Sequence, residues 1–278
     1  MAVTQALLDR KIALLVDDFH YIPADVQKSI IQALKGPVHK GLSVILLAVP
    51  HRAFDPIVVE DELQGRFVHI PIPNWSMDDL LLIPQRGFQA LNVTLSATAQ
   101  RRICEEAFGN PLLVQEVCSN LCGAADIWET TITRTALSPT LLDPTFSAVA
   151  ASKGFPKYRK LREGPQARKA RQPRSLRSGD TADIYECLLL ALGRLGPKPR
   201  NTYDEIRAAL RELLEETQMP AKHEVTAALS HMNKIAQSLE GEPPLEFVRD
   251  EDALVITDPF LLFYMKWERE KVAPGAQA

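Results

Sequence analysis

Two continuous apolar runs near the start of the chain constrain its fold more than any other feature. Lys11–Val16 and Leu42–Val49 are apolar at almost every position, apart from Lys11 and Ser43, and they are bounded by charged or turn residues. A strand that is buried on both faces has this pattern, whereas a strand with one wet face alternates. Phe67–Ile72 predicts a third, shorter strand. We therefore expect a parallel sheet covered by helices.

A helix is predicted between the first two strands, as a parallel connection requires. Pro23 is expected to open it and Gly36-Pro37 to end it. The apolar stripe of this helix comprises Val26, Ile30, Ile31 and Leu34.

From residue 76 onward the pattern is helical. Ser76, with Asp79 three residues later, is typical of a capped helix start, and Ser96 predicts another. Gly109-Asn110-Pro111 fits a helix junction, with Gly ending one helix, Asn capping the next and Pro as its first residue.

Residues 151–180 differ from the rest in charge. They contain ten Lys/Arg and two acids, a net charge of +8, so with −3 overall the remaining residues carry −11. Apolar periodicity is weak there, and Gly and Pro are frequent. This pattern predicts a basic linker or long loop, about 147–181, and a candidate contact for nucleic acid or another acidic surface.

The last part, about 182–270, predicts three helices, a β-hairpin and a final helix. Thr202-x-x-Glu205 is a capping box for the second helix, and Pro220 opens the third. Leu245–Val248 and Ala253–Ile256 alternate like paired strands, and Asp258-Pro259 starts the last helix. Three helices followed by a hairpin is the order of a winged-helix domain, here with net charge −7 between residues 183 and 270.

The composition argues against several classes of protein. The chain has 278 residues, of which 46% are apolar and 24% charged, as in ordinary globular proteins. No apolar run approaches the ~18 residues of a membrane span, and the first residues do not resemble a signal peptide. Four cysteines are too few and too scattered for a disulfide framework. We expect a cytoplasmic protein with reduced thiols and no membrane contact.

The first apolar run ends in two acids, Asp17 and Asp18. Phosphoryl-transfer sites use such a pair, in which one carboxylate holds the water shell of Mg²⁺ and a second orients the attacking water. Apolar strands that end in Asp are also common as solvated strand ends, so the pair alone leaves both interpretations open.

Further motifs give the chain a family resemblance. Leu15-Val16-Asp17-Asp18-Phe19-His20-Tyr21 resembles a Walker B strand, and Gly65-Arg66-Phe67 a segment with an arginine finger. Gly109-Asn110-Pro111-Leu112 and Asp258-Pro259-Phe260-Leu261 match positions in the lid and near the end. With these motifs the chain resembles the P-loop ATPases of the AAA+ and STAND group that have an origin-recognition-like core and a winged helix. The resemblance runs from about Lys11 to Trp267, except the linker.

The resemblance implies a role for each matching position. Asp17 would hold Mg²⁺, and Asp18 would orient the attacking water. Arg52 or His51 would read the γ-phosphate of ATP. Arg66 would reach the nucleotide of a neighbouring subunit, or be a surface arginine paired with Glu60 or Glu62. Gly109, Asn110 and Pro111 would approach the base or phosphates from the lid.

One family motif is missing from the sequence. No G-x-x-x-x-G-K-[ST] phosphate loop occurs, and only ten residues precede Lys11, where the family places that loop. The chain thus resembles the C-terminal part of such an ATPase. The first part is lost, or encoded by a separate gene, or left out because the start of the chain was assigned too far downstream. Autonomous ATP hydrolysis is not expected. The expected partners are a separately encoded P-loop half or further copies of this chain.

The resemblance implies an α/β parallel-sheet partial P-loop NTPase core over 1–75, with an α-helical lid over 76–146. The basic linker over 147–181 and an α+β winged-helix domain over 182–270 follow. The expected function is a nucleotide-dependent switch or scaffold that uses ATP and Mg²⁺ when the P-loop half is supplied. The alternative is a non-catalytic winged-helix module that binds DNA or protein.

Overall fold

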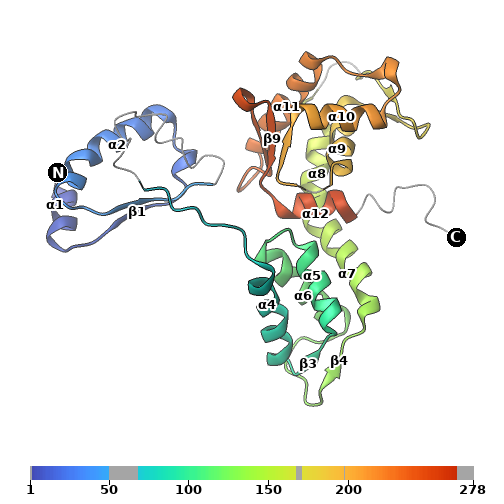
Figure 1. Cartoon of the computed structure of the whole chain (residues 1–278), viewed down its shortest axis with the longest axis horizontal. Coiled ribbons are helices and arrows are strands. Elements are labelled where there is room, and N and C mark those ends of the chain that lie inside the picture. The colour runs from blue at the N-terminus through green and yellow to red at the C-terminus, as the bar shows by residue number, and fades with distance from the viewer. Residues whose placement is uncertain (1, 50–67, 167–170, 197, 268–278) are drawn as a thin grey trace. The chain divides into compact units, whose positions relative to one another are not determined.

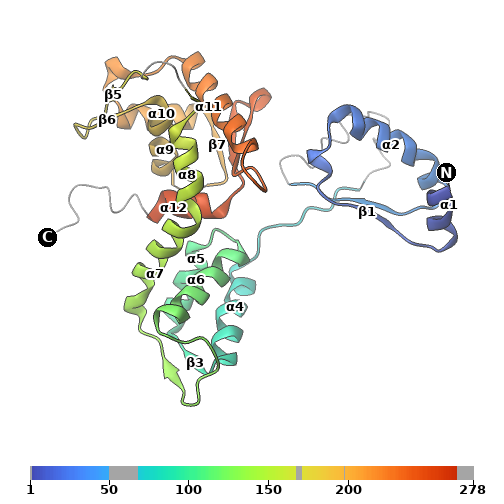
Figure 2. The ribbon, with the colours of Figure 1, turned by 180° about the vertical axis from the view of Figure 1, so that it is seen from behind.

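The computed structural model describes residues 2–49, 68–166, 171–196 and 198–267. The chain divides into two compact units, residues 1–73 and 74–278, which are described separately here. Figure 1 labels the elements, and Figure 2 shows the same ribbon from behind.

Unit 1 is built around one parallel strand pair. Helix α1 (Ala2–Asp9) precedes β1 (Leu14–Val16), and helix α2 (Ala24–His39) connects β1 to β2 (Val44–Leu46). Leu14 pairs with Val44 and Val16 with Leu46. The predicted strand–helix–strand unit with parallel pairing is confirmed.

Three details of the prediction for unit 1 are wrong. Helix α2 continues through Pro37 because the proline lies in the last turn, where the N–H of Lys40 bonds to the Gly36 carbonyl. Residues 68–72 form no strand. The sheet is not buried on both faces, because the paired side chains of Leu15 and Ile45 remain 55% and 48% exposed.

The first part of unit 2 is a helical body with a small parallel pair. Its helices are α4 (Met77–Ala90), α5 (Ala97–Glu106), α6 (Pro111–Ala124) and α7 (Leu142–Val149). Strands β3 (Val93–Thr94) and β4 (Thr135–Ala136) pair beside them, and a short 3₁₀ turn, η4 (Pro139–Leu141), precedes α7. The side chains of Ser76, Ser96 and Asn110 cap their helices as the sequence predicts.

The region predicted as a basic linker is largely helical. Helix α7 continues through a π-helical turn, η5 (Ala150–Gly154), into α8 (Phe155–Glu163), and both views show one continuous ribbon. Leu161 of α8 is fully buried in the second core of the unit. The linker prediction is wrong for residues 147–163 because these residues pack as a helix. Strands β5 (Arg174–Ser175) and β6 (Thr181–Ala182) then form a short antiparallel pair.

The remainder of unit 2 has the order helix, strand, helix, helix, strand, strand. The elements are α9 (Ile184–Arg194), β7 (Arg200–Thr202), α10 (Tyr203–Leu213), α11 (Lys222–Gln237), β8 (Leu245–Val248) and β9 (Ala253–Ile256), with short 3₁₀ turns η6 (Glu216–Gln218) and η7 (Arg249–Glu251). The sheet is antiparallel with order β7-β9-β8. The capping box of α10 and the hairpin strands are confirmed at the predicted residues.

Helix α12 (Pro259–Trp267) joins the two cores of unit 2. Leu261 and Met265 belong to the core around α9–α11, while Phe263 and Trp267 belong to the core around α4–α7. Asp258 caps the helix by accepting the N–H groups of Phe260 and Leu261 at 2.7 and 3.1 Å. Because one helix contributes to both clusters, the two parts of unit 2 share their packing.

Candidate functional site

The two predicted acids lie where β1 leaves the sheet. The Leu47 N–H donates to the Val16 carbonyl at 2.9 Å, and the Phe19 N–H donates to the Leu47 carbonyl at 3.0 Å. Asp17 and Asp18 lie between these two bonds, at the carboxyl end of the parallel pair. The edge of an open parallel sheet where the strands end is where ligands bind in such folds.

Backbone geometry at the acids is special. Asp18 adopts a left-handed conformation, with φ of 54°, which Asp tolerates better than most residues. Its N–H donates to a carboxylate oxygen of Asp17 at 2.9 Å. The 3₁₀ turn η1 (Phe19–Tyr21) follows directly. The turn therefore presents two consecutive exposed carboxylates at the strand end.

A buried glutamine holds this turn in place. The Gln27 side chain, 3% exposed, donates from Nε2 to the carbonyls of Phe19 and Ile22 at 3.1 and 2.9 Å. Phe19 itself is fully buried. The sequence interpretation assigned Val26 to the apolar stripe of α2 and overlooked Gln27, whereas Val26 is 42% exposed. A signal was available, because Gln27 is four residues before Ile31 and so shares its face.

The two acids have no ion-pair partner in the part of the chain that the structure describes. Among the described residues, neither Asp17 nor Asp18 takes part in an ion pair, and no group of three or more His, Cys, Asp or Glu could enclose a metal. Mg²⁺ in nucleotide sites takes one or two carboxylates and completes its shell with water and phosphate oxygens. The pair fits that partial role, but the sequence offers no phosphate loop to hold a nucleotide.

The lid motif is a helix junction in the structure. Gly109 has φ of +76°, and an added Cβ would lie 2.9 Å from the Asn74 Cβ. The Asn110 side-chain oxygen accepts the Leu113 N–H at 3.0 Å, and Pro111 is the first residue of α6. The predicted roles of Asn110 as helix cap and Pro111 as first residue are confirmed. The predicted role of Gly109 in ending the preceding helix is wrong, because α5 ends at Glu106, its C-cap is Ala107, and Phe108 takes the left-handed conformation after it with φ of 51°. Contact with a nucleotide stays a prediction, since this junction belongs to unit 2 and the acids to unit 1.

Three further predicted residues, His51, Arg52 and Arg66, lie outside the described residues. Their roles as γ-phosphate sensor and arginine finger stay predictions.

Most of the positive charge of residues 151–180 that the structure describes is paired. Lys157 bonds to the buried carboxylate of Asp258. The other pairs with acids of α6, α9, α11 or the loop before α9 are Lys153–Glu116 at 3.3 Å, Arg162–Glu186 at 2.7 Å, Arg171–Asp183 at 2.7 Å and Arg174–Glu224 at 2.8 Å. The excess of basic residues in this segment is therefore matched in part by acidic residues elsewhere in the same chain. Nucleic-acid contact through this segment stays a prediction.

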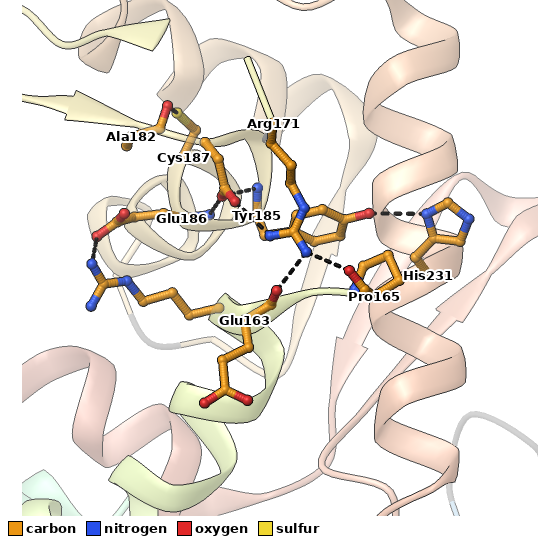
Figure 3. A network of polar contacts seen from close by, with 10 residues as sticks. Glu163, Pro165, Arg171, Ala182, Tyr185, Glu186, Cys187 and His231 are labelled. Atoms are coloured by element: carbon orange, nitrogen blue, oxygen red, sulfur yellow. Dashed lines mark hydrogen bonds and ion pairs between the residues drawn. The ribbon is translucent and has the colours of Figure 1, made fainter. Parts of the chain in front are cut away.

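Arg171 is at the centre of the largest of these networks (Figure 3). Its guanidinium donates to the carbonyls of Glu163 and Pro165 at 2.6 and 2.5 Å, and its carbon lies 4.7 Å from the centre of the Tyr185 ring. The Tyr185 hydroxyl is 3.0 Å from Nδ1 of His231 on α11. Burial raises the pKa of Tyr185. The network joins the end of α8 to α9 and α11, which is a structural role.

The cysteines of the helical body have low reactivity. Cys104 and Cys122 are buried, Cys118 is partly buried, and none of the three is in a disulfide. Burial raises the pKa of Cys104 to about 11 and raises the pKa of Cys118 further still. Because the thiolate is the nucleophile and the metal ligand, a raised pKa lowers the reactivity of these thiols.

No helix in the described part of the chain is long and apolar enough to cross a membrane. The chain matches no model of a known protein family and no curated protein.

Proposed function

We propose that the chain is a nucleotide-dependent switch or scaffold of the AAA+/STAND type whose nucleotide site is completed by a phosphate-binding loop from outside these 278 residues. One observation carries the proposal: two consecutive exposed carboxylates follow a parallel strand at the carboxyl edge of its sheet, in a turn held by buried side chains. This placement supports the Walker B role that the family resemblance implies.

Each residue of the turn has a defined task in this proposal. Asp17 binds the water shell of Mg²⁺, and Asp18 orients a water molecule. Mg²⁺, when bound, supplies positive charge that neutralises phosphate oxygens. Gln27 fixes the turn, so the two carboxylates are placed before any ligand arrives. Arg66 would complete a site between protomers.

The partly exposed sheet of unit 1 supports the proposal that another polypeptide element packs on it. Parallel sheets occur almost only with both faces covered. Here Leu15 and Ile45 leave one face about half exposed. A further element on that face, from a separate P-loop half or another copy, would bury them.

The test is equilibrium binding of Mg²⁺-ATP and Mg²⁺-ADP to the full chain by calorimetry. The chain alone is expected to bind more weakly than about 0.1 mM, or about 5.5 kcal/mol, because no phosphate cradle is present. Mn²⁺, followed by water-proton relaxation, probes the acid pair without nucleotide. We expect weak Mn²⁺ binding that falls at least threefold in Asp17→Asn.

Asp25→Asn is the matched control, since Asp25 is also an exposed acid of unit 1 and its loss changes the net charge equally. Equal loss of Mn²⁺ binding in both variants would reduce the acid pair to general surface charge and refute the proposal. Nucleotide binding tighter than 0.1 mM that persists in Asp17→Asn would refute it as well.

A second candidate is a non-catalytic winged-helix module. The order of elements from α9 to β9 supports it. Within that candidate, protein contact is favoured over DNA, because Lys222 at the start of α11 and Arg200 of β7 are paired with Asp252 and Glu251 at 2.7 and 2.6 Å. Phosphate contacts supply most of the affinity for DNA. A fluorescent duplex tests this directly: binding that is lost in Lys222→Ala with Lys234→Ala would favour DNA.

A further inference from the structure

An exposed tryptophan follows helix α6. After the helix cap Ala125, Asp126 takes a left-handed conformation with φ of 57°, and the Ile127 N–H donates to the Cys122 carbonyl at 2.9 Å. Ile127 is buried and anchors the chain to the core, so the next side chain faces outward. Trp128 is 77% exposed.

Trp128 is nonetheless held in one position. Its indole Nε1 donates to an Asp126 carboxylate oxygen at 3.0 Å. Its ring lies against α6 at Gly123, where an added Cβ would come within 2.9 Å of the indole Cη2. A large apolar ring that is fixed yet left in water binds a partner at low entropic cost, which is why Trp is prominent among interface hot spots.

A groove of about 430 Å³ lies beside Trp128, between α6 and α7. Its floor and walls are mostly small or apolar, and none of the lining residues is charged. They are Ser119, Asn120, Gly123, Ala124, Trp128, Leu141, Pro144, Thr145 and Ala148. Thr145, 3% exposed, has a buried hydroxyl without a hydrogen-bond partner. The groove therefore suits an apolar side chain.

Two acids flank the tryptophan in the sequence. Asp126 and Glu129 flank Trp128 in the sequence, and both are exposed. In the described part of the chain, neither forms an ion pair. A basic side chain of a partner would meet these carboxylates and the face of the indole together, since Lys and Arg bind Trp rings through cation–π contacts.

We propose that Trp128 and this groove bind a peptide segment of a partner protein in which an apolar side chain lies within a few residues of Lys or Arg. The apolar side chain enters the groove between α6 and α7, and the basic one contacts Asp126, Glu129 and the indole. The site lies wholly in unit 2, so it does not depend on the acid pair of unit 1.

The test selects random dodecapeptides displayed on phage against the immobilised full chain. Enriched peptides are expected to carry an aromatic or aliphatic residue within four positions of Lys or Arg. The enriched peptides are then synthesised and their affinities measured by titration. Their affinity for Trp128→Ala should be at least tenfold lower than for wild type, as is typical when a hot-spot aromatic residue is removed. Trp75→Ala is the control, because Trp75 is also exposed in unit 2 and is not among the residues that line the groove. The affinity of the Trp75→Ala variant for the peptides should stay within twofold of wild type.

Two further variants separate binding from folding. Asp126→Asn keeps a side-chain oxygen that can accept the indole N–H, and Asn tolerates the left-handed backbone at this position. The double variant Asp126→Asn with Glu129→Gln should bind the peptides roughly threefold to tenfold more weakly, and its binding should depend less on salt. Gly123→Ala displaces the indole while favouring the helix, so binding should fall without a lower melting temperature. No enrichment, acidic consensus peptides, or unchanged affinity for Trp128→Ala would overturn the proposal.

Discussion

At the scale of single residues, Glu205 shows how one side chain can set a pH dependence. Its carboxylate accepts an ammonium hydrogen of Lys198 and, at the start of α10, the Thr202 N–H at 2.8 Å and the Thr202 hydroxyl at 3.0 Å. The hydrogen bond from Lys198, followed by those from Thr202, lowers the pKa of Glu205 to about 2. A carboxyl with a lowered folded pKa stabilises the protein above its unfolded pKa of about 4.3 and loses that contribution as pH falls toward 2.

Glu205→Gln is therefore expected to lower the urea midpoint at pH 7, with a difference from wild type that shrinks between pH 4.5 and 2.5. Glu212→Gln serves as the control, because Glu212 lies on the same helix and its ion pair with Arg194 spans 3.9 Å. A difference between wild type and Glu205→Gln that is constant with pH would show that the carboxyl charge is not responsible.

At the scale of elements, the π-helical turn and α12 pack closely where they cross. A Cβ on Gly154 would lie 2.3 Å from the Phe260 carbonyl oxygen and 2.4 Å from the Tyr264 Cβ. Gly154→Ala should destabilise the protein by about 2–3 kcal/mol, because two backbones must separate. Chemical unfolding measures this.

The same substitution at Gly87 is a matched control. Gly87 lies within α4 and has nothing within 4 Å of an added Cβ. Gly87→Ala should stabilise the protein by about 0.5–1 kcal/mol through helix propensity. Similar effects of the two substitutions would show that the crossing is not close-packed.

Elements with strong local signals could be predicted from the sequence. The bounds of the hairpin strands are predictable because apolar runs and turn residues act over a few positions, although the expected alternation is wrong for β9, whose four residues are all buried. The caps at Ser76, Asn110 and Thr202 are predictable because each bond is made within three residues. The helix at 150–163 was missed for a physical reason. Among residues 150–163, those buried are Ala150, Gly154 and Leu161, so Leu161 is the one large apolar side chain that marks the buried face. The apolar period of the stretch is therefore weak, and its burial depends on close packing against α12.

At the scale of the whole molecule, the two units differ in how much they bury. In the described part of unit 1, the buried apolar residues are Phe19, Ile31 and Leu42. Unit 2 has two extensive cores joined by α12. Amide hydrogen exchange is expected to be faster in α2 and β1 than in α9–α11, since protection follows buried contacts. Equal protection would show that unit 1 gains stability from contacts beyond its own small core.

The candidate site was predictable only in part at this scale. A short motif placed Asp17 and Asp18 at the end of a strand, because strand direction and burial are encoded locally. The buried support from Gln27 depends on how α2 packs on the turn. Whether the basic residues of 151–180 are paired depends on acids far away along the chain, such as Asp258, which lies about a hundred residues from its partner Lys157. Segment-by-segment interpretation could therefore not reveal that most of the described basic residues of the stretch are in ion pairs.

The π-helical turn between α7 and α8 also makes the chain tolerant of one change in length. Its wider ring holds one residue more than a regular helix needs, so deleting the exposed Ala151 should leave an ordinary α-helix with Leu161 still facing its core. Deleting Arg159, within α8, would instead rotate the following residues by roughly 100° and turn Leu161 outward. At this one turn, evolution can thus shorten the gene by a codon without redesigning either core.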